Sequence, residues 1–347
     1  MIKRRLLVLI SLIGIALGGA FVFFFYQVFF WDNTRIEEKN ISIYIPTDST
    51  PREILQLLSP HLKSVENFRL AAQKKAYFDH IKPGKFTIPK GIGNNDLINL
   101  LRRGGEEIRV TFNNAERLEN LAHKIALQIE ADSLSLIKAF KDPEFLSEAG
   151  FNLDTALSMY LPNSYSFFWN TTAVEFRDRM AKEYQRFWNS KRLSQAEELG
   201  LNPQEVSALA AIVQRETLKP DERPRVAGVY LNRLRKRMRL QADPTVIYAM
   251  KQKFNNYDTI VRRVLYKDLR IQSPYNTYRN RGLPPGPIWM PDLGALEAVL
   301  NAEKHDFIYF VVDLSRPGYH AFARNLREHN KNKRNYVRWL NKKGIRR

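Results

Sequence analysis

The feature that most constrains this chain is an uninterrupted apolar run over residues 6–31, with no ionisable side chain before Asp32. A helix needs roughly 20 apolar residues to cross a bilayer, so this run is long enough. The cationic triplet Lys3-Arg4-Arg5 precedes it, and acidic residues follow it at once, which by the positive-inside rule places the N-terminus in the cytoplasm. We therefore predict a cytoplasmic N-terminus at residues 1–5 and a transmembrane anchor at residues 6–31.

A cleaved signal peptide is the alternative interpretation of this run. Its apolar region would span about 7–15 residues and end in small residues of the A-x-A kind, and the sequence meets neither condition. We therefore expect an uncleaved, single-pass protein of the cytoplasmic (inner) membrane whose remaining chain is extracytoplasmic or periplasmic. The sequence has no cysteine, which excludes disulfides, thiolate nucleophiles and cysteine-bound zinc.

The length and charge of the chain limit its organisation and its partners. With 347 residues it exceeds what one core usually fills, so we expect two units outside the membrane. The formal net charge of +19 favours anionic partners, whether nucleic acid, lipid headgroups or an anionic wall polymer. The predicted extracytoplasmic side argues against nucleic acid. The basic tail over residues 331–347 is equally well explained as a solvated end.

After a short polar linker, residues 40–105 have the pattern of a small α+β module. Ile41, Ile43 and Ile45 alternate with polar residues and predict a strand. Thr50-Pro51 predicts a helix start, and a second helix, a second strand and a third helix follow, the last ending at Gly104-Gly105. This β-α-α-β-α order contains nothing that looks catalytic.

Residues 107–340 form the larger predicted unit, and Glu216 is its most informative residue. The helix that starts at Asn202-Pro203 carries an apolar stripe, and Glu216 lies on the border of that stripe. A carboxyl group against apolar side chains loses hydration, so its pKa rises towards values at which it can donate a proton near neutrality. By pattern alone, a solvated glutamate or one paired with Arg223 or Arg225 is the commoner outcome.

Two later clusters have the composition of a carbohydrate groove, with amides, hydroxyls and tyrosines beside stiff turns. The residues that we expect to line it are Gln241, Asp243, Tyr275, Asn276 and Thr277. Each also has a structural explanation, with Asp243 as a helix cap and the tyrosines as core. The six histidines show no metal-ligand spacing, so we predict no metal and no cofactor.

Several long blocks of the second unit have unusual local sequence. The blocks are Ile212–Thr217, Glu222–Leu234, Leu240–Tyr248, Tyr275–Tyr278, Gly282–Gly286, Leu296–Asn301, Phe307–Val311 and His320–Phe322 with His329-Asn330. In their order and spacing they resemble the endolytic murein transglycosylase (YceG-like) family. The anchor and the small module, which is similar to that family's LysM-like subdomain, extend the resemblance over nearly the whole chain.

The resemblance implies a fold and a reaction. It implies an α+β chain with one transmembrane helix, a LysM-like β-α-α-β module and a larger YceG-like catalytic domain. It also implies that Glu216 acts first as acid and then as base in cleaving the bond between N-acetylmuramic acid (MurNAc) and N-acetylglucosamine (GlcNAc), which leaves 1,6-anhydroMurNAc ends. Peptidoglycan glycan strands are then the substrate, strand termination is an implied role, and contact with peptidoglycan synthases is a hypothesis.

Two departures from the family pattern and two rival functions remain. The aromatic loop reads Leu157-Ser-Met-Tyr160, without the glutamate that family members often carry there, and Pro317-Gly-Tyr-His320 replaces the usual Gly-Gly-His.

A muramidase-type hydrolase would pair Glu216 with a second carboxylate, Glu222 or Asp243, about 5–9 Å away. A wall-binding scaffold without catalysis is the second alternative.

Overall fold

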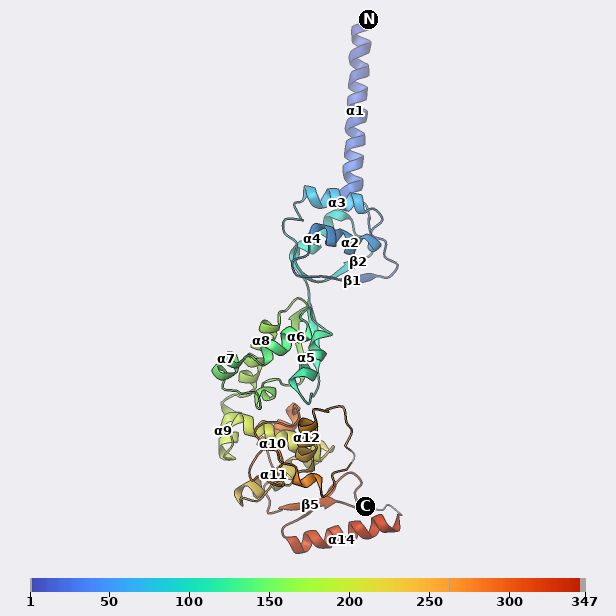
Figure 1. Cartoon of the computed structure of the whole chain (residues 1–347). Helices are drawn as coiled ribbons and strands as arrows, with labels where there is room; N and C mark the ends of the chain where they lie inside the picture. The colour runs from blue at the N-terminus through green and yellow to red at the C-terminus, as the bar shows by residue number, and fades with distance from the viewer. Residues whose placement is uncertain (1, 262, 344–347) are drawn as a thin grey trace. The chain divides into compact units, whose positions relative to one another are not determined.

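The computed structural model describes residues 2–261 and 263–343, which form two compact units (Figure 1). The first unit runs up to Val110 and takes in the short segments 128–131 and 165–172. The second comprises residues 111–127 and 132–164 and everything described from Ala173 onward. The mixed α+β class expected from the sequence is confirmed.

The apolar run forms one long helix, α1 (Ile2–Phe29), in which the stretch Arg4–Phe29 is long and apolar enough to cross a membrane. Its apolar side chains are exposed over most of that length. The polar linker that we expected after it is wrong. Val28 and Ile36 belong to the core of the first unit, and Asn33 donates hydrogen bonds to Ser64 O and Asn94 Oδ1, both at 2.8 Å.

The rest of the first unit has the predicted β-α-α-β-α order. Thr50 caps its first helix in a capping box with Glu53, as the Thr50-Pro51 pattern predicted. The strands pair antiparallel with Ile43 opposite Phe86, so their apolar faces close over the helices. The elements are β1 (Asn40–Ile45), α2 (Pro51–Leu58), η1 (Ser59–His61), α3 (Val65–Lys74), β2 (Gly84–Pro89) and α4 (Asn94–Arg103).

A second group of elements follows, and two sequence expectations fail in it. The sequence over residues 115–130 predicts one helix, but the helix in the structure is shorter. The aromatic residues at 160–169 predict a loop, but this segment contains a strand that pairs with residues 107–112. The elements are β3 (Glu107–Phe112), α5 (Leu118–Ala126), α6 (Ser133–Phe140), α7 (Pro143–Glu148), η2 (Ala156–Met159), β4 (Asn163–Phe168) and α8 (Ala173–Phe187).

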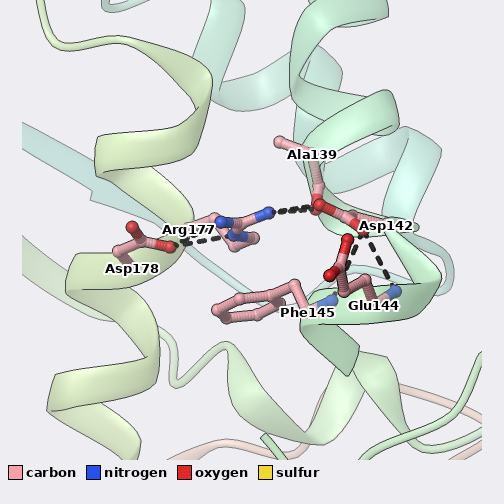
Figure 2. Close-up of polar contacts among 6 residues, drawn as sticks. All are labelled: Ala139, Asp142, Glu144, Phe145, Arg177 and Asp178. Carbon is pink, nitrogen blue, oxygen red and sulfur yellow. Dashed lines mark hydrogen bonds and ion pairs between the residues drawn. The ribbon is translucent and has the colours of Figure 1, made fainter. Parts of the chain in front are cut away.

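Helices α6, α7 and α8 meet around the buried side chain of Arg177 (Figure 2). Its guanidinium group forms ion pairs with Asp142 and Asp178 at 3.0 and 2.8 Å and lies 3.7 Å from the centre of the Phe145 ring. Asp142 also caps α7 by accepting hydrogen bonds from the backbone amides of Glu144 and Phe145. The two ion pairs offset part of the desolvation cost of burying Arg177, and removal of either carboxylate would leave its charge less well compensated.

The remaining elements surround α10 (Pro203–Glu216), in which every residue from Val206 to Val213 is buried. A helix that is apolar on all sides belongs in the centre of a core, and α10 contacts four other helices. The elements are α9 (Ser190–Glu198), η3 (Pro220–Glu222), α11 (Arg223–Arg235), α12 (Asp243–Phe254), η4 (Asp268–Arg270), α13 (Leu293–Leu300), β5 (Tyr309–Val312), β6 (His320–Ala323) and α14 (Leu326–Lys342).

The proline-glycine loop before α13 is fixed by one close approach of two backbones. A Cβ atom built on Gly286 would lie 1.9 Å from the carbonyl oxygen of Asp154. A backbone oxygen cannot move aside as a flexible side chain can, so only glycine fits at this position. The loop is therefore held against the segment that leads into η2.

We expect Gly286→Ala to lower the stability of the second unit by about 1–3 kcal/mol, as overpacking does elsewhere. The measurement is the midpoint of thermal unfolding of the full chain in detergent. Gly294→Ala is the matched control, because its added Cβ would meet side-chain atoms and no backbone, Asp292 Oδ1 at 3.3 Å and Arg223 Nη1 at 3.7 Å, and alanine favours a helix. An unchanged midpoint for Gly286→Ala would contradict the close approach.

Candidate active site

Glu216 is the last residue of α10, and its carboxyl group lies against buried side chains. The Tyr230 hydroxyl, on α11, donates a hydrogen bond to it. Desolvation, together with the negative charge of Asp243, raises the pKa of Glu216 to about 7, whereas the bond from Tyr230 and the positive charge of Arg233 lower it. A carboxyl group with this pKa can both give and take a proton near neutrality.

Arg223 and Arg225, the alternative partners of Glu216, bind elsewhere. Arg223 forms an ion pair with Asp292 at 2.9 Å, and Arg225 forms one with Glu303 at 2.9 Å. Both arginines are therefore paired with other carboxylates, and the half-buried Glu216 instead accepts a hydrogen bond from Tyr230.

Two tyrosines and one arginine complete the surroundings of Glu216. Tyr278 donates a hydrogen bond of 2.6 Å to Asp243 Oδ1, and burial keeps the pKa of its phenol above the usual range, so the hydroxyl stays protonated. Arg233 is buried and donates from Nε to the Ile308 carbonyl at 2.7 Å. Sequence reasoning assigned no role to Tyr230, Arg233 or Tyr278, although all three stand within the blocks that carried the family resemblance.

Of the five residues predicted to line a groove, two are exposed. Asp243 begins α12, and its charge acts on Glu216. Gln241, two residues earlier, has a left-handed backbone conformation with φ of 51°. Its backbone N–H donates a hydrogen bond to the Thr277 carbonyl at 3.2 Å. This strained turn fixes how the chain enters α12.

The other three predicted residues have buried side chains bonded inside the protein. The Tyr275 hydroxyl donates to Asp154 at 2.9 Å. Asn276, with 0% of its surface exposed, donates to the carbonyls of Leu269 and Ile271. The Thr277 hydroxyl, 1% exposed, accepts from the Ala242 amide at 3.0 Å. These bonds join the segment 275–278 to the start of α12.

Glu222, the other second carboxylate that we considered, is 5% exposed, and its bonds are made within the protein. It accepts from the Thr217 hydroxyl at 2.9 Å and from the His320 backbone amide at 2.7 Å, and it contacts His320 Nδ1 at 2.8 Å. Glu222 thus ties the end of α10 and the start of α11 to β6. His320 stands in the block that departs from the family's Gly-Gly-His.

The other departure from the family pattern, in the aromatic loop, can also be located in the structure. Ser158, in the loop where family members often carry a glutamate, is buried in η2. Among the described residues its hydroxyl has no hydrogen-bond partner. No role of the family's glutamate can therefore be transferred to this position.

The comparison with known proteins covers the region that contains these blocks. Residues 43–335 match the YceG-like family, and the chain belongs to that family. Two relatives named endolytic murein transglycosylase are similar to it. The one from Bacillus subtilis (strain 168) is 29% identical over 94% of this chain and 92% of its own length. The one from Streptococcus pneumoniae (strain D39) is 28% identical over 86% of this chain, which spans 59% of that longer protein.

A solved structure shows the same fold. The crystal structure of a YceG-like protein from Listeria monocytogenes superposes with a TM-score of 0.56 at 25% identity, covering 84% of this chain and 98% of that one. The family membership predicted from the sequence is confirmed.

Two substitutions should shift the pKa of Glu216 in opposite directions. Tyr230→Phe removes the hydrogen bond that favours the carboxylate, so the pKa should rise above about 7. Asp243→Asn removes the neighbouring negative charge, so the pKa should fall below about 7. Carboxyl ¹³C NMR titration of the glutamate-labelled chain measures both, with Glu216→Gln identifying the signal. A shift of both variants in the same direction would contradict the assigned causes.

Burial of Glu216 should also make the stability of the second unit depend on pH. Between pH 4.5, the ordinary pKa of a glutamate side chain, and pH about 7, the folded chain holds a proton that the unfolded chain has lost, so stability falls as pH rises. Glu216→Gln lacks this loss and should exceed the wild type by about 1–3 kcal/mol at pH 8 but not at pH 4. Thermal unfolding of both chains at the two pH values tests it, and a difference that does not depend on pH would refute it.

Proposed function

We propose that this chain is a peptidoglycan lytic transglycosylase that cleaves the MurNAc–GlcNAc bond with Glu216 and leaves 1,6-anhydroMurNAc ends. One observation carries the proposal: in a YceG-like chain, the carboxyl group at the end of α10 is desolvated and has a pKa raised to about 7. The names of the relatives from Bacillus subtilis and Streptococcus pneumoniae support the substrate and the reaction class.

The proposed reaction needs one carboxyl group in two roles. Protonated Glu216 gives its proton to the glycosidic oxygen as the bond from MurNAc C1 to GlcNAc O4 breaks. The resulting carboxylate takes the proton of the MurNAc C6 hydroxyl while O6 bonds to C1. The proton returns to Glu216, no water is consumed, and the nucleophile is held within the same sugar, which lowers the entropic barrier.

The neighbours of Glu216 suit this exchange of a proton. Asp243 disfavours the carboxylate, so the acid holds its proton until the glycan binds. Tyr230 and Arg233 stabilise the carboxylate of Glu216, so they limit the rise of its pKa and the carboxylate can form once the proton is given up. We assign contact with substrate to the exposed Gln241 and Asp243, and we assign a positioning role to Tyr275, Asn276 and Thr277, because their side-chain bonds are made inside the protein.

A muramidase-type hydrolase is the second candidate, and one observation favours it. Asp243 is exposed, and its charge acts on Glu216, so it could activate a water molecule. Glu222 is a poor choice for that role because Thr217 and His320 occupy its carboxylate. The two reactions differ in their products, since a hydrolase leaves reducing MurNAc ends.

We further propose that α1 is an uncleaved anchor in the cytoplasmic membrane, with both units on the outer side. The packing of Val28 and Ile36 in the core of the first unit supports this, because cleavage near the end of the apolar run would remove part of that core. The LysM-like assignment of residues 40–105, the extent of the catalytic domain over residues 107–340, strand termination and contact with synthases stay predictions from the family resemblance.

Mass spectrometry of purified glycan strands digested by the full chain in detergent tests the reaction and the residue together. The wild type should release products with anhydromuramyl ends, and Glu216→Gln should lower their rate of formation at least about 100-fold, the usual contribution of general acid–base catalysis. Glu198→Gln, which removes an exposed carboxylate from α9, is the matched control and should match the wild type.

The other outcomes decide between the alternatives. Reducing ends without anhydromuramyl ends would establish the hydrolase. A Glu216→Gln chain that cleaves as fast as the wild type would remove Glu216 from the mechanism. Glycan that is bound and never cleaved by the wild type would favour the wall-binding scaffold.

A further inference from the structure

One cavity in the unit that holds Glu216 lies outside the candidate active site, and the proposed reaction does not use it. Its volume is about 320 Å³, and three tyrosine side chains line it, Tyr248, Tyr257 and Tyr275. Ligand sites in proteins start at about this size and combine aromatic walls with a few polar groups. We call it the tyrosine cavity. Exposed residues such as Asp154 and Gln252 form part of its wall, so it opens to solvent.

Helix α12 connects the tyrosine cavity to the candidate active site. Asp243, whose charge acts on Glu216, begins the helix, and Tyr248 and Gln252 on the same helix line the cavity. At 1.5 Å per residue, these two residues lie roughly 7 and 14 Å along the helix from Asp243. A rigid helix thus fixes the spacing between the two places.

The segment 275–278 makes a second connection. Its first residue, Tyr275, lines the cavity and donates to Asp154, and its last, Tyr278, donates to Asp243 at the candidate active site. The loop that ends at Gly286 closes the wall, because Gly286 packs on the Asp154 carbonyl and Pro287 lines the cavity. Tyr275 and Gly286, from two blocks of the family resemblance, therefore help to shape this cavity.

The charges on the wall are compensated, which points to an uncharged ligand. Glu119 pairs with Lys141 at 2.5 Å, and Glu116 pairs with Lys251 at 2.9 Å. The guanidinium group of Arg117 lies 3.9 Å from the centre of the Tyr257 ring and forms a longer ion pair with Glu119, also at 3.9 Å. The remaining carboxylate, that of Asp154, accepts a hydrogen bond from the Tyr275 hydroxyl. The cavity offers aromatic surface and hydrogen-bond acceptors without net charge, and hydroxyl-rich sugar rings carry the groups that these would contact.

We propose that the tyrosine cavity is a distal subsite that holds another sugar residue of the glycan strand being cut at Glu216. This inference rests on the proposed function. It predicts that a strand long enough to reach from the candidate active site into the cavity is cleaved more efficiently than a shorter one. The subsite thereby makes the enzyme select long strands and cut away from their ends.

The test compares purified uncrosslinked glycan strands of two lengths, long strands and the shortest that the full-length wild type cleaves. Tyr257→Ala should lower the ratio of kcat/KM for long over short strands by roughly five- to tenfold, the effect of losing one aromatic contact. Gln252→Ala should lower the same ratio to a smaller extent, and Tyr257→Phe, which keeps the ring, should retain it. Phe254→Ala is the matched control, because Phe254 ends α12, the helix that carries Gln252, is 67% exposed and does not line the cavity.

Each outcome supports or refutes the subsite. A lowered ratio in Tyr257→Ala but not in Phe254→Ala supports the subsite. If the wild type cleaves both lengths and the ratio is unchanged in Tyr257→Ala, the subsite is refuted while the proposed function stands. Equal losses on both lengths would show that Tyr257 acts on folding or on Glu216, which also refutes it. A wild type that cleaves strands of no length overturns the proposed function and the subsite together.

Discussion

The second unit depends on the burial of α10 on all of its sides. Because Val206 to Val213 pack against four neighbouring helices, the end of α10 is delivered into surroundings already poor in water. Glu216 occupies that end, and its raised pKa follows from the packing more than from any single partner. The same burial that stabilises the unit therefore creates its reactive group, and the ionised carboxylate offsets part of that stability.

The residues in the blocks that resemble the family have two kinds of role. Glu216, Tyr230 and Asp243 act on one proton and its electrostatic surroundings. Asn276, Thr277 and Gly286 instead fix backbone segments against one another through buried hydrogen bonds or a close approach that only glycine permits. Some residues of these blocks therefore act near the Glu216 carboxyl group, and others hold the backbone in place. The residues of the second kind have buried side chains or closely packed backbone.

The sequence predicted most of the elements and the central carboxyl group, because these follow from local signals. Capping at Thr50 and Asn202 and the apolar periodicity around Glu216 need only neighbouring residues. The surroundings of Glu216 could not be predicted in this way. Tyr230 follows it on the next helix and Tyr278 lies some sixty positions further on, so only tertiary packing brings their hydroxyls to Glu216 and Asp243. The strand at residues 163–168 was missed because its partner, residues 107–112, is equally remote.

The direct continuation of α1 into the first unit has a mechanical consequence. Asn94 donates to the Val28 carbonyl at 2.7 Å, and Asn33 is bonded to Ser64, so the helix end and the module turn as one body with no slack between them. If α1 spans the bilayer, the module is held flush with the lipid headgroups and its tilt follows that of the helix. A change in the tilt of α1 would then reorient the whole first unit at the membrane surface.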